Sequence, residues 1–136
     1  MYGARGTQAY AKMEVESAVM SASQSQLVSM LFDGALNALV RARLFLQDGN
    51  LEGKGLSLSK AINIIDNGLK VGIDEASSDE LTQNLLALYT YMVRRIFEAN
   101  MQNDISAIEE VENLLRNIAD AWKEVAQSPN RTQDVV

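Results

Sequence analysis

The sequence predicts an all-α fold: an antiparallel up-and-down four-helix bundle preceded by a short N-terminal helical segment. Four long segments repeat apolar residues at helical spacing, and no segment alternates convincingly as a strand would. The connections between these segments are short, which makes consecutive helices antiparallel neighbours. With 136 residues, the chain is long enough to bury a core without disulfides. It contains one proline and no cysteine.

The first long helix is expected over residues 24–47. Ser23 and Gln26 have the spacing of a capping box, in which the serine oxygen accepts from a free backbone amide and the glutamine reaches back. The residues 48–50, Asp-Gly-Asn, are expected to end the helix, because glycine and asparagine accept the left-handed backbone that follows a helix.

Three further helices are expected after this one. The second begins near Leu56 or Leu58 and ends near Asp74, so that the stretch DGNLEGKG before it forms a mobile turn. The third starts at Ser77, which forms a second capping box with Glu80. The fourth follows Asn103-Asp104. Their apolar stripes are Leu58, Ile62, Ile65, Leu69 and Ile73; Leu81, Leu85, Leu88, Met92, Ile96 and Ala99; and Ile108, Val111, Leu115, Ile118, Trp122 and Val125.

The chain is expected to form a single domain, residues 1–136, with different behaviour at its two ends. Residues 1–22 form a mobile N-terminal segment, whose short, weakly amphipathic helix is marginal in water unless it docks. Residues 23–126 form the helical bundle. Residues 127–136 have little to bury and form a flexible tail.

Composition excludes several functional classes. The net charge of −6 argues against a sequence-independent nucleic-acid binder, which would neutralise phosphates with lysine and arginine. The absence of histidine and cysteine excludes histidine-dependent triads and zinc sites with nitrogen or sulfur ligands. No signal peptide or membrane-spanning run is present, so a cytoplasmic protein without membrane insertion is expected. We therefore expect no enzyme activity, no metal and no cofactor.

Two charged clusters have a functional and a bland interpretation. Arg41-Arg43 and Arg94-Arg95 could line an anion pocket, as in small all-helical enzymes that hold dicarboxylates, but arginine beside a bundle seam is more often at the surface or salt-bridged. The acidic cluster at residues 109–112 could be imagined as a cation site, and a solvated helix face is the better interpretation.

The helix expected over residues 24–47 has too much apolar surface for an ordinary surface helix. On a helical wheel at about 100° per residue, one apolar face contains Leu27, Leu31, Gly34, Ala35, Ala38, Ala42 and Phe45. A second face beside it contains Val28, Phe32, Leu36, Leu39 and Leu46. Contact with two neighbouring helices needs only a little more than about 100° of apolar arc. The excess indicates either a deeply buried helix or a groove for an apolar helix of another protein, and periodicity alone favours neither.

Five stretches together resemble one protein family. They are AYAKMEVESA (9–18), LVSMLFDGALNALVRAR (27–43), LSKAINIIDNGL (58–69), DELTQNLLALYTYMVRR (79–95) and IADAWKE (118–124). In this order, over nearly the whole chain, they are similar to the flagellin-specific export chaperone family (FliS). Many members have proline where this chain has Gln24, and Gly-Gly where it has Ser78-Asp79; neither change touches the apolar faces.

The resemblance implies a cytosolic helical bundle that binds the C-terminal region of newly made flagellin. It implies that the chaperone keeps flagellin from polymerising prematurely and hands it to the flagellar type III export apparatus for filament assembly, without ATPase activity. The flagellin-binding groove is expected to consist of Val28, Phe32, Leu36, Leu39, Tyr89, Met92 and Val93. A displaceable N-terminal cover and its pocket are expected to consist of Tyr10, Val15, Leu27 and Leu31.

The alternative function is regulatory. The same fold could sequester another flagellar assembly factor or regulator, or it could be a purely structural helical subunit. Co-purification would separate regulation from export, and mixing with flagellin would expose a purely structural role by yielding no complex.

Overall fold

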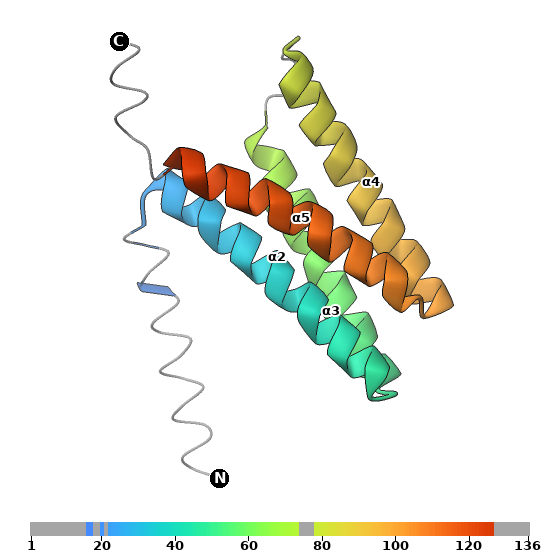
Figure 1. The fold of residues 1–136 in the computed structure, drawn as a ribbon. Helices are drawn as coiled ribbons and strands as arrows, with labels where there is room; N and C mark the ends of the chain where they lie inside the picture. Colours follow the sequence, from blue (N-terminus) through green and yellow to red (C-terminus); the bar gives the residue numbers. More distant parts are fainter. Residues whose placement is uncertain (1–15, 18–19, 21, 74–77, 127–136) are drawn as a thin grey trace, which may run out of the picture.

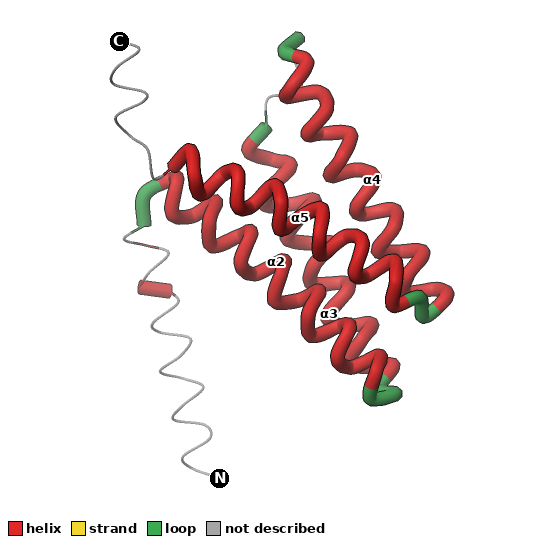
Figure 2. The backbone as a smooth tube through the Cα atoms, viewed as in Figure 1, coloured by secondary structure: helices red, strands yellow, loops and turns green. Residues whose placement is uncertain are grey.

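The computed structural model describes residues 16, 17, 20, 22–73 and 78–126, and within these residues it contains helices and no strand. Four α-helices dominate (Figures 1 and 2). They are α2 (Gln24–Gln47), α3 (Leu51–Ile64), α4 (Glu80–Gln102) and α5 (Ile105–Ala126), with a π-helical turn η1 (Ile65–Leu69) and a 3-10 turn η2 (Lys70–Gly72) after α3. The all-α prediction is confirmed.

Each helix runs antiparallel to the one before it in the bundle. Helix α2 packs against α3 and α5, and α4 packs against α5 and α3. In Figure 1, α2 runs downward and α3 returns upward behind it. Helix α4 then runs downward on the right of the view, and α5 returns upward beside α2. This is the up-and-down order that short connections predict.

The predicted boundaries of the first helix are confirmed. Ser23 Oγ accepts from the Gln26 amide at 3.2 Å, and Gln26 Oε1 accepts from the Ser23 amide at 2.8 Å, which completes the capping box. At the other end, the Asp48 amide donates to the Leu44 carbonyl, and Gly49 adopts a positive φ of 76°. Both ends therefore follow from local sequence.

The predicted start of the second helix was wrong, because α3 begins at Leu51 and the expected mobile turn is mostly helical. Asn50 caps the helix by accepting from the Gly53 amide at 2.9 Å. Gly53 lets the helix lie directly on Phe45, since a Cβ there would stand 2.8 Å from the ring. Lys54 is buried, and its Nζ donates to the Asn100 carbonyl at 2.9 Å and to Asn103 Oδ1 at 2.7 Å. These tertiary contacts outweigh the low helix propensity of the three glycines in this stretch.

The C-terminal part of the second helix is irregular. In the π-helical turn η1, Gly68 lies so close to Leu31 of α2 that a Cβ would meet its side chain at 2.9 Å. The helix then tightens into η2 and ends at Gly72, because Ile73 has an extended backbone. It therefore stops slightly before the predicted Asp74, which lies outside the described residues.

The predicted capping box at Ser77 was wrong. Helix α4 begins at Glu80 with Asp79 as its N-cap residue, and Ser77 itself lies outside the described residues. Asp79 Oδ2 accepts from the Thr82 hydroxyl at 3.1 Å. The next connection agrees with the sequence, since Asn103 has a left-handed backbone (φ 53°) and α5 begins directly after Asp104.

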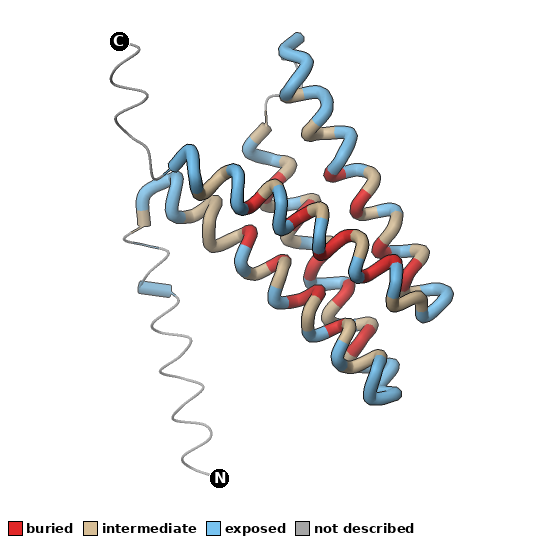
Figure 3. The backbone as a smooth tube through the Cα atoms, in the orientation of Figure 1, coloured by how far each residue is buried: buried red, intermediate tan, exposed pale blue. Residues whose placement is uncertain are grey.

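Burial is concentrated at one end of the bundle (Figure 3). We call the half near the α2–α3 and α4–α5 connections the closed end, and the half with the start of α2, η2, the start of α4 and the end of α5 the open end. No residue of α2 before Phe32 is buried, none of α4 before Tyr89, and none of α5 after Ala119. On α2, α4 and α5 the apolar stripes continue into the open end without being enclosed, whereas the stripe of the second helix stays buried as far as Leu69.

Candidate functional site

Helix α4 shows the change from enclosed to exposed most directly. Its stripe at the closed end, Met92 and Ile96, is 0% exposed. Toward the open end, Leu88 is 36% exposed and Leu81 is 74% exposed, with Leu85 half-buried between them. Figure 1 shows why, because α4 and α5 diverge from their shared connection toward the open end.

Helices α5 and α2 contribute apolar side chains to the same end. On α5, Ile118 and Trp122 are half-buried and Val125 is 65% exposed. On α2, Val28 and Leu31 are half-buried. All of these except Val125, together with Leu85, pack against the margin of the buried core. We define the open-end apolar surface as Val28, Leu31, Leu81, Leu85, Leu88, Ile118, Trp122 and Val125.

Trp122 has a further peculiarity. Its Nε1 atom is buried, yet no hydrogen-bond partner for it is found within the described part of the chain. A buried donor without a partner loses its hydration with no compensation. The open end therefore contains an indole N–H whose bonding potential is unused.

Polar contacts hold the helices together, mostly toward the closed end. The side chain of Glu112 is almost fully buried and accepts from Arg43 Nε at 2.8 Å, which joins α5 to α2. Glu110 accepts from the Tyr91 hydroxyl and, at 2.9 Å, from Arg95 Nε, which joins α5 to α4. At the open end, Lys123 donates to Asp33 at 2.8 Å in a pair that is open to solvent.

These contacts and burial shift several pKa values. The hydrogen bond from Tyr91, followed by that from Arg95, lowers the pKa of Glu110. Hydrogen bonds to Glu98 and Glu110 raise the pKa of Arg95, and the hydrogen bond to Glu112 raises that of Arg43. Burial raises the pKa of Tyr89 to about 12, so its hydroxyl stays protonated at physiological pH.

The predicted flagellin-binding residues fall into two groups. Phe32, Leu39, Tyr89 and Met92 are buried in the core, while Val28, Leu36 and Val93 are half-buried and pack against it. The second apolar face of α2 is therefore occupied largely by its contacts within the bundle. Only Val28 belongs to the open-end apolar surface, and the role of all seven in binding stays a prediction.

The predicted N-terminal cover, Tyr10 and Val15, lies outside the described residues. Its predicted pocket, Leu27 and Leu31, is half-buried near the start of α2, at the open end. Leu81, Leu88 and Val125 had been assigned to the core stripes of their helices. Their exposure could not be read from periodicity, which places residues on a face without showing where the neighbouring helix ends.

The described residues contain no metal-binding cluster and no membrane-spanning helix. Among the described residues, no three histidine, cysteine, aspartate or glutamate side chains gather as they would around a metal ion. None of the described helices combines the length and the apolar character that crossing a membrane requires. Exposed apolar side chains occur at both ends of the described bundle, and at the open end they continue the stripes that form the core of α4 and α5.

Known proteins are similar to this chain in sequence over most or all of its length. Residues 6–129 match the family described as "Flagellar protein FliS". The chain is 71% identical over 136 residues, the whole of both chains, to the flagellar secretion chaperone FliS of Escherichia coli. It is 62% identical over 126 residues, 93% of each chain, to FliS of Salmonella typhimurium, and 32% identical over 116 residues, 85% of each chain, to FliS of Bacillus subtilis.

Proposed function

The chain belongs to the FliS family, and from that premise we propose that it is a flagellar secretion chaperone for flagellin. In this proposal it binds the C-terminal region of flagellin in the cytoplasm, prevents premature polymerisation and delivers the subunit to the flagellar export apparatus. It does so without catalysis, metal or cofactor. The relatives of Escherichia coli and Salmonella typhimurium are flagellar secretion chaperones, which supports the chaperone role, and the open-end apolar surface supports the mode of binding.

The observation that carries the proposal is the exposure of Leu81 and Leu88 on the stripe that is buried further along α4. Large apolar side chains that are exposed together with their neighbours mark an interaction site. An amphipathic helix recognises such a surface through side chains spaced three and four residues apart. Residues 80–88 span about 13 Å of helix, enough for two to three turns of a bound helix.

The physical requirement of the function fits this surface. A terminal segment that orders on binding loses conformational entropy, which buried apolar area must offset. Burial of one leucine side chain stabilises a complex by roughly 1.5–3 kcal/mol. Burial of several side chains at the open end therefore helps to offset the cost of ordering a helical segment.

The predicted binding residues take different parts in this proposal. Val28 contacts the client directly, while the buried Phe32, Leu39, Tyr89 and Met92 belong to the core that holds the helices in place. The N-terminal cover anchored by Tyr10 would compete for the same end, since its predicted pocket at Leu27 and Leu31 lies there. When the cover can dock, the apparent affinity for the client is the intrinsic affinity multiplied by the fraction of molecules in which the cover is open.

The test is calorimetric titration with a peptide of flagellin's C-terminal segment, in buffer with EDTA and without nucleotide. We expect one-to-one binding with a negative heat-capacity change, because apolar area is buried. The double variant Leu81→Ser/Leu88→Ser should weaken binding tenfold or more, since about 1.4 kcal/mol corresponds to a factor of ten.

The matched control is Leu44→Ser/Leu51→Ser, which removes two exposed leucines at the closed end (49% and 52% exposed). It should leave the affinity within about a factor of two, as surface changes away from a binding site do. Equal losses in both double variants, or no loss in either, would remove the open end from the binding site. A requirement for a divalent cation would contradict the proposed mode of binding.

A further inference from the structure

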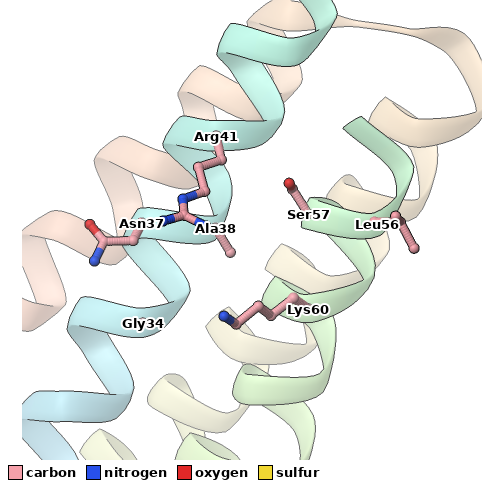
Figure 4. Close-up of a pocket in the computed structure, with 7 residues that line it drawn as sticks. All are labelled: Gly34, Asn37, Ala38, Arg41, Leu56, Ser57 and Lys60. Atoms are coloured by element: carbon pink, nitrogen blue, oxygen red, sulfur yellow. The ribbon is translucent and has the colours of Figure 1, made fainter. Parts of the chain in front are cut away.

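A second possible binding site lies between α2 and α3, and it shares no residue with the open-end apolar surface. A cavity of about 250 Å³ lies there. Figure 4 shows that its lining residues come from both helices. Gly34, Asn37, Ala38 and Arg41 of α2 face Leu56, Ser57 and Lys60 of α3. Lys60 extends from α3 toward α2, while the guanidinium of Arg41 lies along α2 beside Asn37.

The two cations of this cavity differ from every other lysine and arginine in the described residues. The others have an ion-pair or hydrogen-bond partner; these are Arg43, Lys54, Lys70, Arg94, Arg95, Arg116 and Lys123. Within the described part of the chain, Arg41 and Lys60 have none. The sequence contains 18 acidic residues against 12 basic ones, so carboxylates are in excess. The cavity thus gathers the two cations that have no partner among the described residues.

The remaining lining residues suit a carboxylate with an apolar neighbour. Gly34 and Ala38 leave room between the helices, and the hydroxyl of Ser57 and the amide of Asn37 can donate to an oxygen. Leu56 lies at the same cavity and is 67% exposed. An acidic side chain could therefore bind between Arg41 and Lys60 while an adjacent apolar side chain contacts Leu56.

We propose that this α2–α3 cavity is a docking site for an acidic segment of a partner protein, which inserts a carboxylate between Arg41 and Lys60. Size favours a protein segment over an enclosed small molecule, because pockets that enclose ligands measure about 300–1,000 Å³. Nucleic acid is disfavoured because it needs many phosphate contacts, whereas this cavity offers two cations, which suits a single carboxylate. The site is separate from the client surface, so both can be occupied at once.

The experiment is a titration of the isotopically labelled protein, followed by amide chemical shifts, with a synthetic amphipathic peptide of glutamate and leucine. The same peptide with every glutamate replaced by glutamine is the first control, and sodium acetate at equal carboxylate concentration is the second. We expect the acidic peptide to shift the amides around Gly34, Arg41 and Lys60, and to bind more weakly as salt rises. The glutamine peptide and acetate should shift them far less.

The variant Arg41→Gln/Lys60→Gln should weaken binding about tenfold, as loss of two partly exposed ion pairs implies. Its matched control, Arg94→Gln/Arg116→Gln, removes the same charge at other exposed positions on α4 and α5 and should change binding less than about twofold. Circular dichroism confirms that both variants stay folded.

Four results would overturn the proposal. One is equal loss in the two double variants, which would indicate general electrostatic attraction. Another is equal shifts by acetate, which would indicate an adventitious ion only. A third is shifts confined to Leu81 and Leu88, which would show that the peptide binds the open end. The last is no shift at all.

Discussion

The two ends of the bundle are built from the same apolar stripes but reach different degrees of burial. At the closed end, short connections hold neighbouring helices together, and Met92, Ile96 and Leu115 are completely buried. At the open end, α4 and α5 have diverged, and the continuation of their stripes is half-buried at Leu85, Ile118 and Trp122 and exposed at Leu81 and Val125. The comparison indicates that the residues that stabilise the fold and the residues proposed to bind the client lie at different positions along the helix axes.

The largest expected effect tests this separation with two leucines. Leu115→Ala at the closed end should lower the free energy of unfolding by about 2–5 kcal/mol, because a fully buried side chain leaves a cavity. Leu81→Ala at the open end should change it by no more than about 0.5 kcal/mol, as exposed substitutions do. Urea unfolding followed by circular dichroism measures both. Similar losses at the two positions would show that the open end is enclosed in solution.

The second comparison uses the two ion pairs between α2 and α5. Arg43→Met should destabilise the protein by about 1–3 kcal/mol, because it leaves the carboxylate of Glu112 buried without its closest partner. The double variant Arg43→Met/Glu112→Met should recover most of this loss. Lys123→Met at the open end should cost less than about 1 kcal/mol, since both partners of that pair are partly in water. Thermal melts of the variants decide the order.

Trp122 provides a third and smaller test. Trp122→Phe should stay within about 1 kcal/mol of the parent protein, because loss of apolar area is offset by removal of the buried N–H without a partner. Trp122→Ala loses the packing as well and should be clearly less stable. If Trp122→Phe is as destabilising as Trp122→Ala, the indole N–H has a partner in solution.

The smallest expected effect is a dependence of stability on pH that arises near the closed end. Hydrogen bonds from Tyr91 and Arg95 lower the pKa of Glu110. Hydrogen bonds from Ser106 and the Ala107 amide lower the pKa of Asp104. A carboxylate with a lowered folded-state pKa contributes stability that is present above its unfolded pKa of about 4 and is lost as pH falls through the folded value. Melting temperature should therefore fall below about pH 4, and less steeply for Glu110→Gln. Parallel curves would remove Glu110 from the acid response.

The sequence was sufficient for the elements whose determinants are local. The capping box of Ser23 and Gln26 and the left-handed Asn103 mark boundaries that the structure confirms. The start of α3 at Leu51 has one local determinant that the sequence analysis missed, the cap by Asn50. Its other supports are contacts of Gly53 with Phe45 and of Lys54 with Asn100, which are distant in sequence or require the helices to be packed already.

The candidate site was harder to predict than the fold. A helical wheel places Phe32 and Val28 on one face of α2, yet the structure buries the first and leaves the second half-exposed. Position along the axis makes the difference, and a wheel contains no axial coordinate. The sequence also does not show which arginine lacks a partner among the described residues. Arg41 and Arg43 look alike in the sequence, and Arg43 is paired because the fold brings a residue 69 positions away beside it.

The π-helical turn at Ile65–Leu69 has a consequence for length variation in this chain. A π turn accommodates one more residue than an α-helical turn. The helical segments on either side of it keep the same faces toward the core. Deletion of a single residue here would convert the turn to regular α-helix and leave Leu58 and Leu69 directed at the core. The same deletion between Leu58 and Ile65 would rotate everything after it by about 100° and expose the buried stripe. The bundle should thus tolerate loss of one residue at this turn and reject it one turn earlier.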